Sequence, residues 1–232
     1  MRHHPDISSL NKLYVLVCVS MFMIFISCST AYLSNNIQKA LKDGDIAKIQ
    51  ESLEQGENPN SKDIEGNAAL FLCPFEEHNS LDIIRLLLKH GADIDTRDDA
   101  GNTPMMFVLL TSNPSREPVE IVQLFLDFGS KPNTQNKLGV SPLMMAALGN
   151  KREIAKLLLK FGANVNLQTD GGKTALILAS MVGGKEVAEL LISAGANLLV
   201  KDKENMTAID YAQKEGHEDI VQMLNKAIKN KR

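Results

Sequence analysis

The longest predominantly apolar run of the chain lies near its N-terminus. Residues 13–26 read LYVLVCVSMFMIFI, a run of 14 residues that follows Arg2 and Lys12 and precedes Ser27. A membrane-spanning helix needs about 20 apolar residues, whereas the apolar core of a signal peptide has about 7–15. The pattern predicts an export signal over residues 1–27, with a helix of the protein core as the less favoured alternative.

Beyond this stretch, apolar and polar positions repeat along nearly the whole chain. Each copy contains an apolar-periodic segment that ends at a glycine and is followed by a polar loop. These glycines are spaced by 35, 38, 33 and 33 residues: Gly56, Gly91, Gly129, Gly162 and Gly195. A unit of this size cannot bury its apolar face alone, so the copies are expected to stack.

The copy at residues 136–168 predicts two helices joined by a turn. Ser141 is placed to cap a first helix that starts at Pro142, where no backbone N–H is needed. Asn150 and Lys151 lead into a second helix, and Gly162 ends that helix with a backbone that glycine adopts easily. The residues expected to face inward are Leu143, Ala146, Ala147, Ile154, Ala155, Leu157, Leu158 and Leu159.

These motifs resemble the ankyrin repeat, whose period is 33 residues. The resemblance is carried by Gly101-Asn102-Thr103-Pro104-Met105, Gly139-Val140-Ser141-Pro142-Leu143 and Gly172-Lys173-Thr174-Ala175-Leu176. It implies an all-α ankyrin-repeat solenoid of stacked helix-turn-helix units with projecting hairpin loops. The implied units are an N-terminal cap repeat at 35–62, repeats at 63–97, 98–135, 136–168 and 169–201, and a C-terminal cap repeat at 202–232.

The sequence departs from the family pattern in three respects. The usual histidine after Thr-Pro-Leu is absent, so its hydrogen bond is lost and packing by methionine is expected to substitute. The second unit has Ala68-Ala69 in place of Thr-Pro and carries Pro74 inside its first helix, and the third has an insert at residues 111–118. The residues at the histidine position are Phe71, Met106, Met144, Ile177 and Asp210.

The end of the N-terminal stretch resembles a bacterial lipobox. In Phe25-Ile26-Ser27-Cys28, a small residue precedes the cysteine that would receive a diacylglycerol and an N-acyl chain such as palmitate. Residues 28–34 would then tether the repeats to a membrane through lipid on Cys28. Cleavage after Ala31, giving a secreted protein, and an uncleaved anchor remain open. The expected location is the bacterial cell envelope, facing the periplasm or the cell surface.

Composition excludes several classes of protein. With 44% hydrophobic residues, 15 glycines and 8 prolines, the chain is neither disordered nor collagen-like. A net charge of −3 gives no reason to expect nucleic acid as a partner. Three cysteines do not make a disulfide framework, and 5% aromatic residues without tryptophan argue against a stacking platform for sugars or bases.

No arrangement for catalysis, a metal or a cofactor emerges. The segment 171–174 resembles the end of a phosphate-binding loop, but Leu167 stands where the first glycine is required. His90 and His217 have no cysteine at zinc-ligand spacing, and the acidic run at 93–99 lacks the glutamate of a calcium loop. Cys73 is expected to be a core thiol. The chain is therefore predicted to be non-enzymatic.

The resemblance implies that a protein partner is bound by hairpin tips and by positions late in each first helix. The helix positions are Phe75, Leu110, Leu148, Met181 and Lys214, and the tip residues are Lys137, Leu138, Val140, Asp170, Lys173, Lys203 and Met206. Local packing of the apolar helix positions is the alternative. The predicted function is a monomeric protein-protein interaction module with a concave binding surface. An immunity protein or inhibitor for an exported toxin or hydrolase, and an accessory protein of a periplasmic oxidative-stress enzyme, are the alternatives.

Overall fold

The computed structural model describes residues 36–75, 79–111 and 118–230. Within these ranges the chain forms eleven α-helices and one 3-10 helix, and its one extended pairing is an antiparallel bridge between Lys62 and Ala68. The predicted signal, the tether with Cys28 and most of the insert lie outside the described residues.

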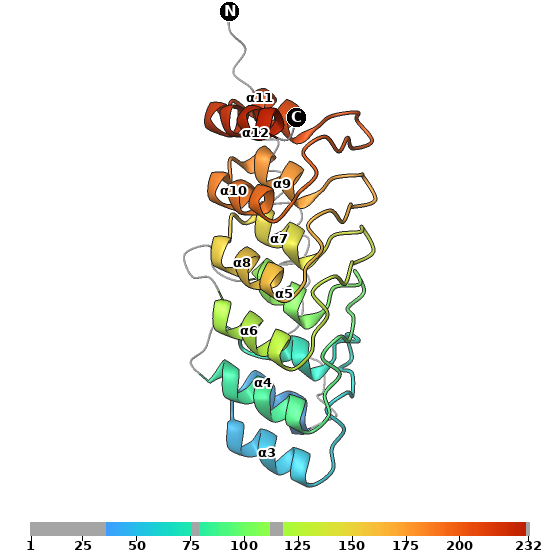
Figure 1. Ribbon diagram of the computed structural model, residues 1–232. Coiled ribbons are helices and arrows are strands. Elements are labelled where there is room, and N and C mark those ends of the chain that lie inside the picture. Colours follow the sequence, from blue (N-terminus) through green and yellow to red (C-terminus); the bar gives the residue numbers. More distant parts are fainter. Residues whose placement is uncertain (1–35, 76–78, 112–117, 231–232) are drawn as a thin grey trace, which may run out of the picture.

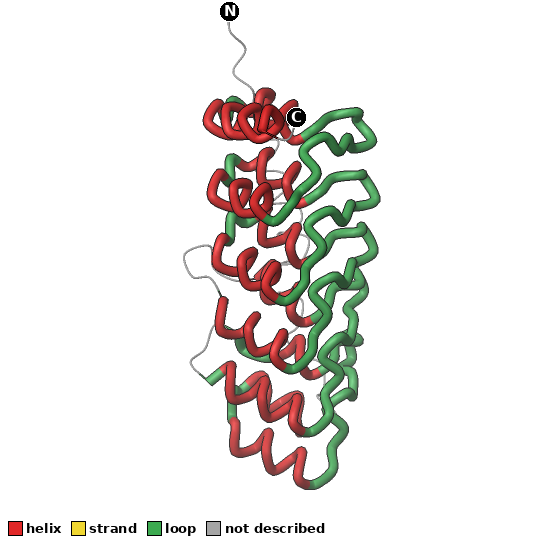
Figure 2. Tube along the Cα trace, viewed as in Figure 1, coloured by secondary structure: helices red, strands yellow, loops and turns green. Residues whose placement is uncertain are grey.

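The helices form consecutive pairs that stack into two rows (Figure 1). The first row contains α2 (Asn36–Lys42), η1 (Ala69–Leu72), α5 (Pro104–Thr111), α7 (Pro142–Leu148), α9 (Ala175–Val182) and α11 (Ala208–Glu215). The second row contains α3 (Ile46–Glu54), α4 (Ser80–Lys89), α6 (Val119–Asp127), α8 (Arg152–Lys160), α10 (Lys185–Ser193) and α12 (Glu218–Asn230). The loops between pairs all project to one side (Figure 2), which confirms the predicted all-α solenoid.

Local capping explains where the helices of the fourth pair begin and end. The Ser141 side chain accepts a hydrogen bond from the Met144 N–H at 3.4 Å, and Pro142 occupies the first helical position, as predicted. At the end of α8, Gly162 has φ +85°, and the Ala163 N–H donates to the Leu158 carbonyl at 2.9 Å. This is the Schellman arrangement, which satisfies carbonyls that the helix leaves free.

The first helix of the second pair is shorter than the first helices of the neighbouring pairs. Its first member, η1, is a 3-10 helix of four residues with no side-chain cap at Ala68. Pro74 follows two residues after its end and has no N–H to continue helical hydrogen bonding. The substitutions that break the repeat pattern therefore shorten the helix but leave Leu70 and Phe71 buried.

One apolar core runs through the whole stack. Small residues on the first row, including Ala146, Ala147 and Ala179, are completely buried and allow adjacent helices to approach closely. Met106 and Met144, at the positions where the family has histidine, are also buried. The Sδ atom of Met144 accepts a hydrogen bond from the Ser141 N–H at 3.4 Å, so it helps to cap α7 as well as to pack.

Polar side chains at one loop position join each repeat to the next. The Asn133 side chain accepts from the Asn164 N–H at 2.6 Å and donates to the Gly162 carbonyl at 3.0 Å. In the same way, a backbone N–H group of the following loop donates to the side chain of Asn60, of Asp95 and of Asn166. In the last repeat this position is Leu199, which is 65% exposed. The sequence of polar links ends there, at the C-terminal end of the array.

The hairpin tips are held by a second set of hydrogen bonds. At the base of one tip, the Asn136 side chain accepts from the Leu138 and Val140 N–H groups, both at 3.0 Å. Neighbouring tips are connected through their backbones. The backbone N–H groups of Lys137, Asp170 and Lys203 donate to the carbonyl oxygens of Ala100, Leu138 and Gly171, respectively, each at 3.0 Å. These bonds keep successive tips in register along the stack.

Gly139→Ala should destabilise the fold more than Gly162→Ala. Both glycines have positive φ, +72° and +85°, so both variants carry a backbone cost of about 1–2 kcal/mol. A Cβ at Gly139 would also lie 2.7 Å from the Asp170 backbone nitrogen, whereas a Cβ at Gly162 would meet nothing within 4 Å. We expect an additional loss of about 1 kcal/mol or more for Gly139→Ala in urea unfolding. Equal losses would show that the tips do not support one another.

Candidate functional site

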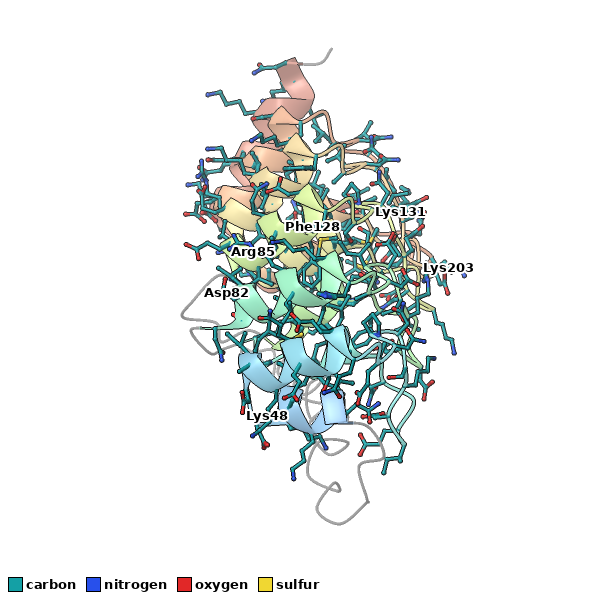
Figure 3. All side chains as sticks on the ribbon, turned by 90° about the horizontal axis from the view of Figure 1, so that it is seen from below. Lys48, Asp82, Arg85, Phe128, Lys131 and Lys203 are labelled. Carbon is teal, nitrogen blue, oxygen red and sulfur yellow. The ribbon has the colours of Figure 1, made fainter. Side chains whose placement is uncertain are left out.

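The central first-row helices differ in charge from the rest of the stack. Helices η1, α5, α7 and α9 contain no charged residue, whereas every second-row helix carries at least one. Outward-facing charges such as Asp82 and Arg85 lie on the helical side of the molecule, and Lys131 and Lys203 lie on the loop side (Figure 3). The uncharged helices therefore form an apolar zone between two charged surfaces.

Two positions recur on the same face of each first-row helix. The later one lies two residues before the left-handed residue that ends the helix, at Lys42, Leu148, Met181 and Lys214. Matching the helix starts places Phe75 and Leu110 at this position in the second and third pairs. The earlier position lies three residues before it. Its residues are Lys39, Leu72, Phe107, Met145, Leu178 and Tyr211.

The structure brings the predicted helix residues into one row, which we call the apolar ladder. It contains the half-buried side chains at both positions of the uncharged zone: Leu72, Phe75, Phe107, Leu110, Leu148 and Met181. Five of them pack against the core and Phe107 contacts the buried Phe71 ring, so local packing, the alternative interpretation, accounts for part of each side chain. The rest of each side chain remains accessible to a partner.

Aromatic contacts fix the N-terminal half of the apolar ladder. The Phe107 ring meets the buried Phe71 ring edge-on, with centroids 5.6 Å apart. It also meets the Phe75 ring at 6.1 Å and 54°. Edge-on and tilted pairs at these separations are favourable arrangements of aromatic rings. Phe75 is thereby held in position although it lies beyond the end of η1.

The predicted tip residues fall into two groups. Leu138 is 66% exposed and Lys137 is also exposed, so both are available at the tip of their hairpin. Asp170 and Lys203 are exposed at the next two tips. Val140 and Met206 are half-buried and pack against the core. The second group therefore supports the loops and contributes less surface than the first.

Lys173 is engaged within the protein. Its Nζ lies 2.8 Å from an Asp202 carboxylate oxygen and 3.4 Å from that of Glu204, both in the following repeat. Asp202 has a side-chain exposure of 0% and also accepts from the Tyr211 hydroxyl at 2.6 Å. The Lys173 ammonium lies 5.0 Å from the centre of the Tyr211 ring. These contacts give Lys173 a structural role between repeats, unlike the lysine of a phosphate-binding loop.

Electrostatics in this cluster stabilise the ion pair. Burial by itself would raise the pKa of Asp202, but hydrogen bonds from Lys173 and Tyr211 outweigh it and hold that pKa at about 2. Burial opposes the charged form of Lys173, yet the bond to Asp202 raises the pKa of Lys173 above its ordinary range. Burial and the bond to Asp202 raise the pKa of Tyr211.

The remaining candidates for chemistry are also explained by the fold. Cys73 is buried, and burial raises the pKa of its thiol, which disfavours the reactive thiolate. The Nε2 atom of His217 lies 3.3 Å from the Met181 carbonyl, between two repeats. Across residues 36–75, 79–111 and 118–230, no group of three His, Cys, Asp or Glu side chains is placed to hold a metal ion. No helix in those ranges is both long and apolar enough to cross a membrane.

Comparison with known families agrees with the geometry. A profile described as ankyrin repeats (3 copies) matches residues 109–202, and one described as ankyrin repeats (many copies) matches residues 75–116. Together they extend over residues 75–202, more than half of the chain. The chain belongs to the ankyrin-repeat family, whose members are generally non-enzymatic modules for protein-protein interaction. No curated protein matches the sequence.

Sequence reasoning missed part of the candidate surface. It selected only the later ladder position, so it left out Leu72 and Phe107 at the earlier one, and Lys39 and Lys42 on α2. It also left out Val182, which follows Met181 and is 36% exposed. Aligning the earlier position across all copies would have found the two apolar residues. Their partial exposure depends on which neighbours cover them.

Asp202→Asn should lower stability at neutral pH and have little effect near pH 2. The pKa of Asp202 is about 2 in the folded protein against an ordinary 3.8, so the carboxylate contributes about 2 kcal/mol when ionised. That contribution is complete above about pH 4 and is lost as the pH falls through about 2. Thermal unfolding of both proteins across this range tests it, with Asp99→Asn at an exposed tip as control. A deficit independent of pH would contradict the ion-pair account.

Proposed function

We propose that this protein is an exported, lipid-anchored interaction module that holds a partner protein on the face formed by its first-row helices and hairpin tips. Its ankyrin repeats indicate protein-protein interaction. The export and the anchor are inferred from the apolar run at residues 13–26 and from the lipobox-like segment that ends at Cys28. The partner would be held in the bacterial envelope, next to the membrane that carries the lipid.

The apolar ladder is the observation that carries this proposal. Four consecutive first-row helices lack charge, and a half-buried apolar side chain recurs at the same repeat position: Phe75 just after η1, then Leu110, Leu148 and Met181 within their helices. Scattered apolar residues are normal on protein surfaces, but a continuous row marks an interaction site. An apolar row of this kind would gain free energy when a partner removes it from water.

Replacing two ladder residues should abolish partner binding. We expect full-length protein with a C-terminal affinity tag to retain one stoichiometric partner from native envelope extract. Leu148→Glu with Met181→Glu should lose it, because two carboxylates would be buried without partners in the interface. Leu199→Glu is the matched control, since Leu199 is 65% exposed and lies outside the ladder.

The melting temperature of each variant separates binding from folding. Both ladder residues are half-buried, so a modest decrease is expected for the double variant. A large decrease in the melting temperature would show that these residues serve the core and not a binding surface. Retention of the same partner by a folded double variant would contradict the proposed surface.

Cys28→Ala should release the protein from the membrane fraction and prevent incorporation of labelled palmitate. The thioether-linked diacylglycerol can form only at a cysteine, and its acyl chains supply most of the membrane affinity, at about 0.8 kcal/mol for each buried CH₂. Cys18→Ser is the matched control because Cys18 lies within the same apolar run but not at the lipobox-like position. Label in the Cys28→Ala protein would exclude lipidation at this site.

A further inference from the structure

We infer that the solenoid opens between its second and third repeats, with the first two helical pairs (residues 36–93) moving as one unit against the rest. The inference does not depend on the proposed function. It follows from three features of the hairpin tip at residues 63–67, which we call the first tip: its hydrogen bonding, the space around its glycine, and the start of the helix that follows it.

Backbone hydrogen bonds join three of the four pairs of neighbouring tips. They run from the tip at 136–140 to the tip at 98–102, and from each of the two later tips to the tip before it. Among the residues that the structure describes, no hydrogen bond joins residues 62–67 to residues 97–102. The stability of a solenoid is approximately the sum over its repeats and the interfaces between neighbours. An interface with fewer bonds is therefore where the array separates first.

The space around the glycine of each tip shows the same difference. A Cβ atom at Gly101 would lie 3.0 Å from the backbone nitrogen of Lys137 in the following tip. The equivalent atom at Gly172 would lie 3.0 Å from the Asp202 Cα atom. A Cβ at Gly66 would meet nothing within 4 Å, although Gly66 has the same kind of backbone, with φ +83°. The first tip therefore does not touch its neighbour where the later tips do.

The helix after the first tip also begins without the cap that follows the later tips. Thr174 and Thr207 each accept a hydrogen bond from the backbone N–H three residues ahead, at 3.3 and 3.4 Å. Ser141 does the same at 3.4 Å. Ala68, at the equivalent position, has no side-chain oxygen, and η1 begins with no side-chain cap. The first tip is therefore less firmly connected both to the next tip and to its own helix.

The first two helical pairs are joined to each other by side-chain hydrogen bonds. The Asn60 side chain accepts from the Asp93 N–H at 2.6 Å and donates to the Gly91 carbonyl at 2.9 Å. The Asn79 side chain, just before α4, donates to the Gly44 carbonyl of the first pair at 2.8 Å. Because both bridges lie within residues 36–93, we expect the two pairs to move together.

Contacts outside the tips remain across the junction and act as a pivot. The Ser130 hydroxyl donates to Asp95 at 3.0 Å, and the Phe107 ring meets the Phe71 ring edge-on. Opening about these contacts separates the first tip from the later tips and changes the curvature of the face that the first-row helices and tips form. A partner that contacts both parts of this face would favour the closed arrangement.

Hydrogen–deuterium exchange of the full-length protein in detergent tests this inference. We expect the amides of α2, α3, η1 and α4 to exchange about tenfold faster than those of α7, α8, α9 and α10. They should share one dependence on urea, because they open as one unit. Equally slow exchange in all repeats would overturn the inference. Fast exchange confined to α2 and α3 would also overturn it, because this is the ordinary fraying of a terminal repeat.

Lys62→Arg should restore a connection at the junction. Lys62 precedes the first tip at the position that Arg97 holds before the next one. The Arg97 Nη1 donates to the carbonyls of Gly101, in its own tip, and Gln135, before the following tip, at 3.0 and 2.9 Å. An arginine at 62 can bridge two carbonyls in the same way, because its planar group carries several N–H donors. We expect exchange in the first two pairs to slow about fivefold, the effect of about one added hydrogen bond.

Lys201→Arg is the matched control. Lys201 holds the same position before the last tip of the described chain and is exposed. Its substitution should leave exchange in the first two pairs unchanged, and equal effects of the two arginines would contradict a specific role of the junction. A second variant, Arg97→Lys, should weaken the next junction, so that α5 and α6 exchange almost as fast as α4. If Lys62→Arg and Arg97→Lys both leave exchange unchanged, the tip hydrogen bonds do not control opening and the inference is wrong.

Discussion

The whole structure depends on the fact that no helical pair can bury its own apolar face. Each pair is too thin to enclose a core, and only stacking between neighbours removes residues such as Ala146, Ala179 and Met144 from water. Stacking in turn requires adjacent pairs to keep one spacing and one orientation. The cap repeats end the stack with more polar helices, because an uncovered apolar face at either end would remain exposed.

Hydrogen bonds in the loops convert this stacking into a defined register. Side chains such as Asn133 reach the backbone of the next repeat, and the tips share backbone bonds from one hairpin to the next. Buried or partly buried polar groups that find partners of this kind make one arrangement more favourable than its alternatives. As a consequence, equivalent positions of successive repeats lie next to one another along the stack. Residues of one kind that recur at such a position therefore form a continuous surface.

The apolar ladder has two roles that compete. Its side chains complete the packing of the first row, and the same side chains supply the surface proposed to meet a partner. Substitutions there affect folding and binding together, which is why exposed residues outside the ladder serve as controls. The Lys173–Asp202–Tyr211 cluster has only the first role, since its charges are satisfied between two repeats.

Much of this architecture is determined by the sequence itself. The repeat period, the Ser141 cap, the Gly162 terminus and the inward-facing apolar residues are local patterns, and the structure has each of them, with Leu159 half-buried and the other predicted core residues of that repeat buried. Other features were decided only by the tertiary structure. Lys173 resembled part of a phosphate-binding loop or a free tip residue until the next repeat placed Asp202 beside it. Leu72 and Phe107 are half-buried, whereas Met145 and Leu178 at the same helix position are buried. Periodicity states which face of a helix is apolar, but exposure depends on what packs against that face.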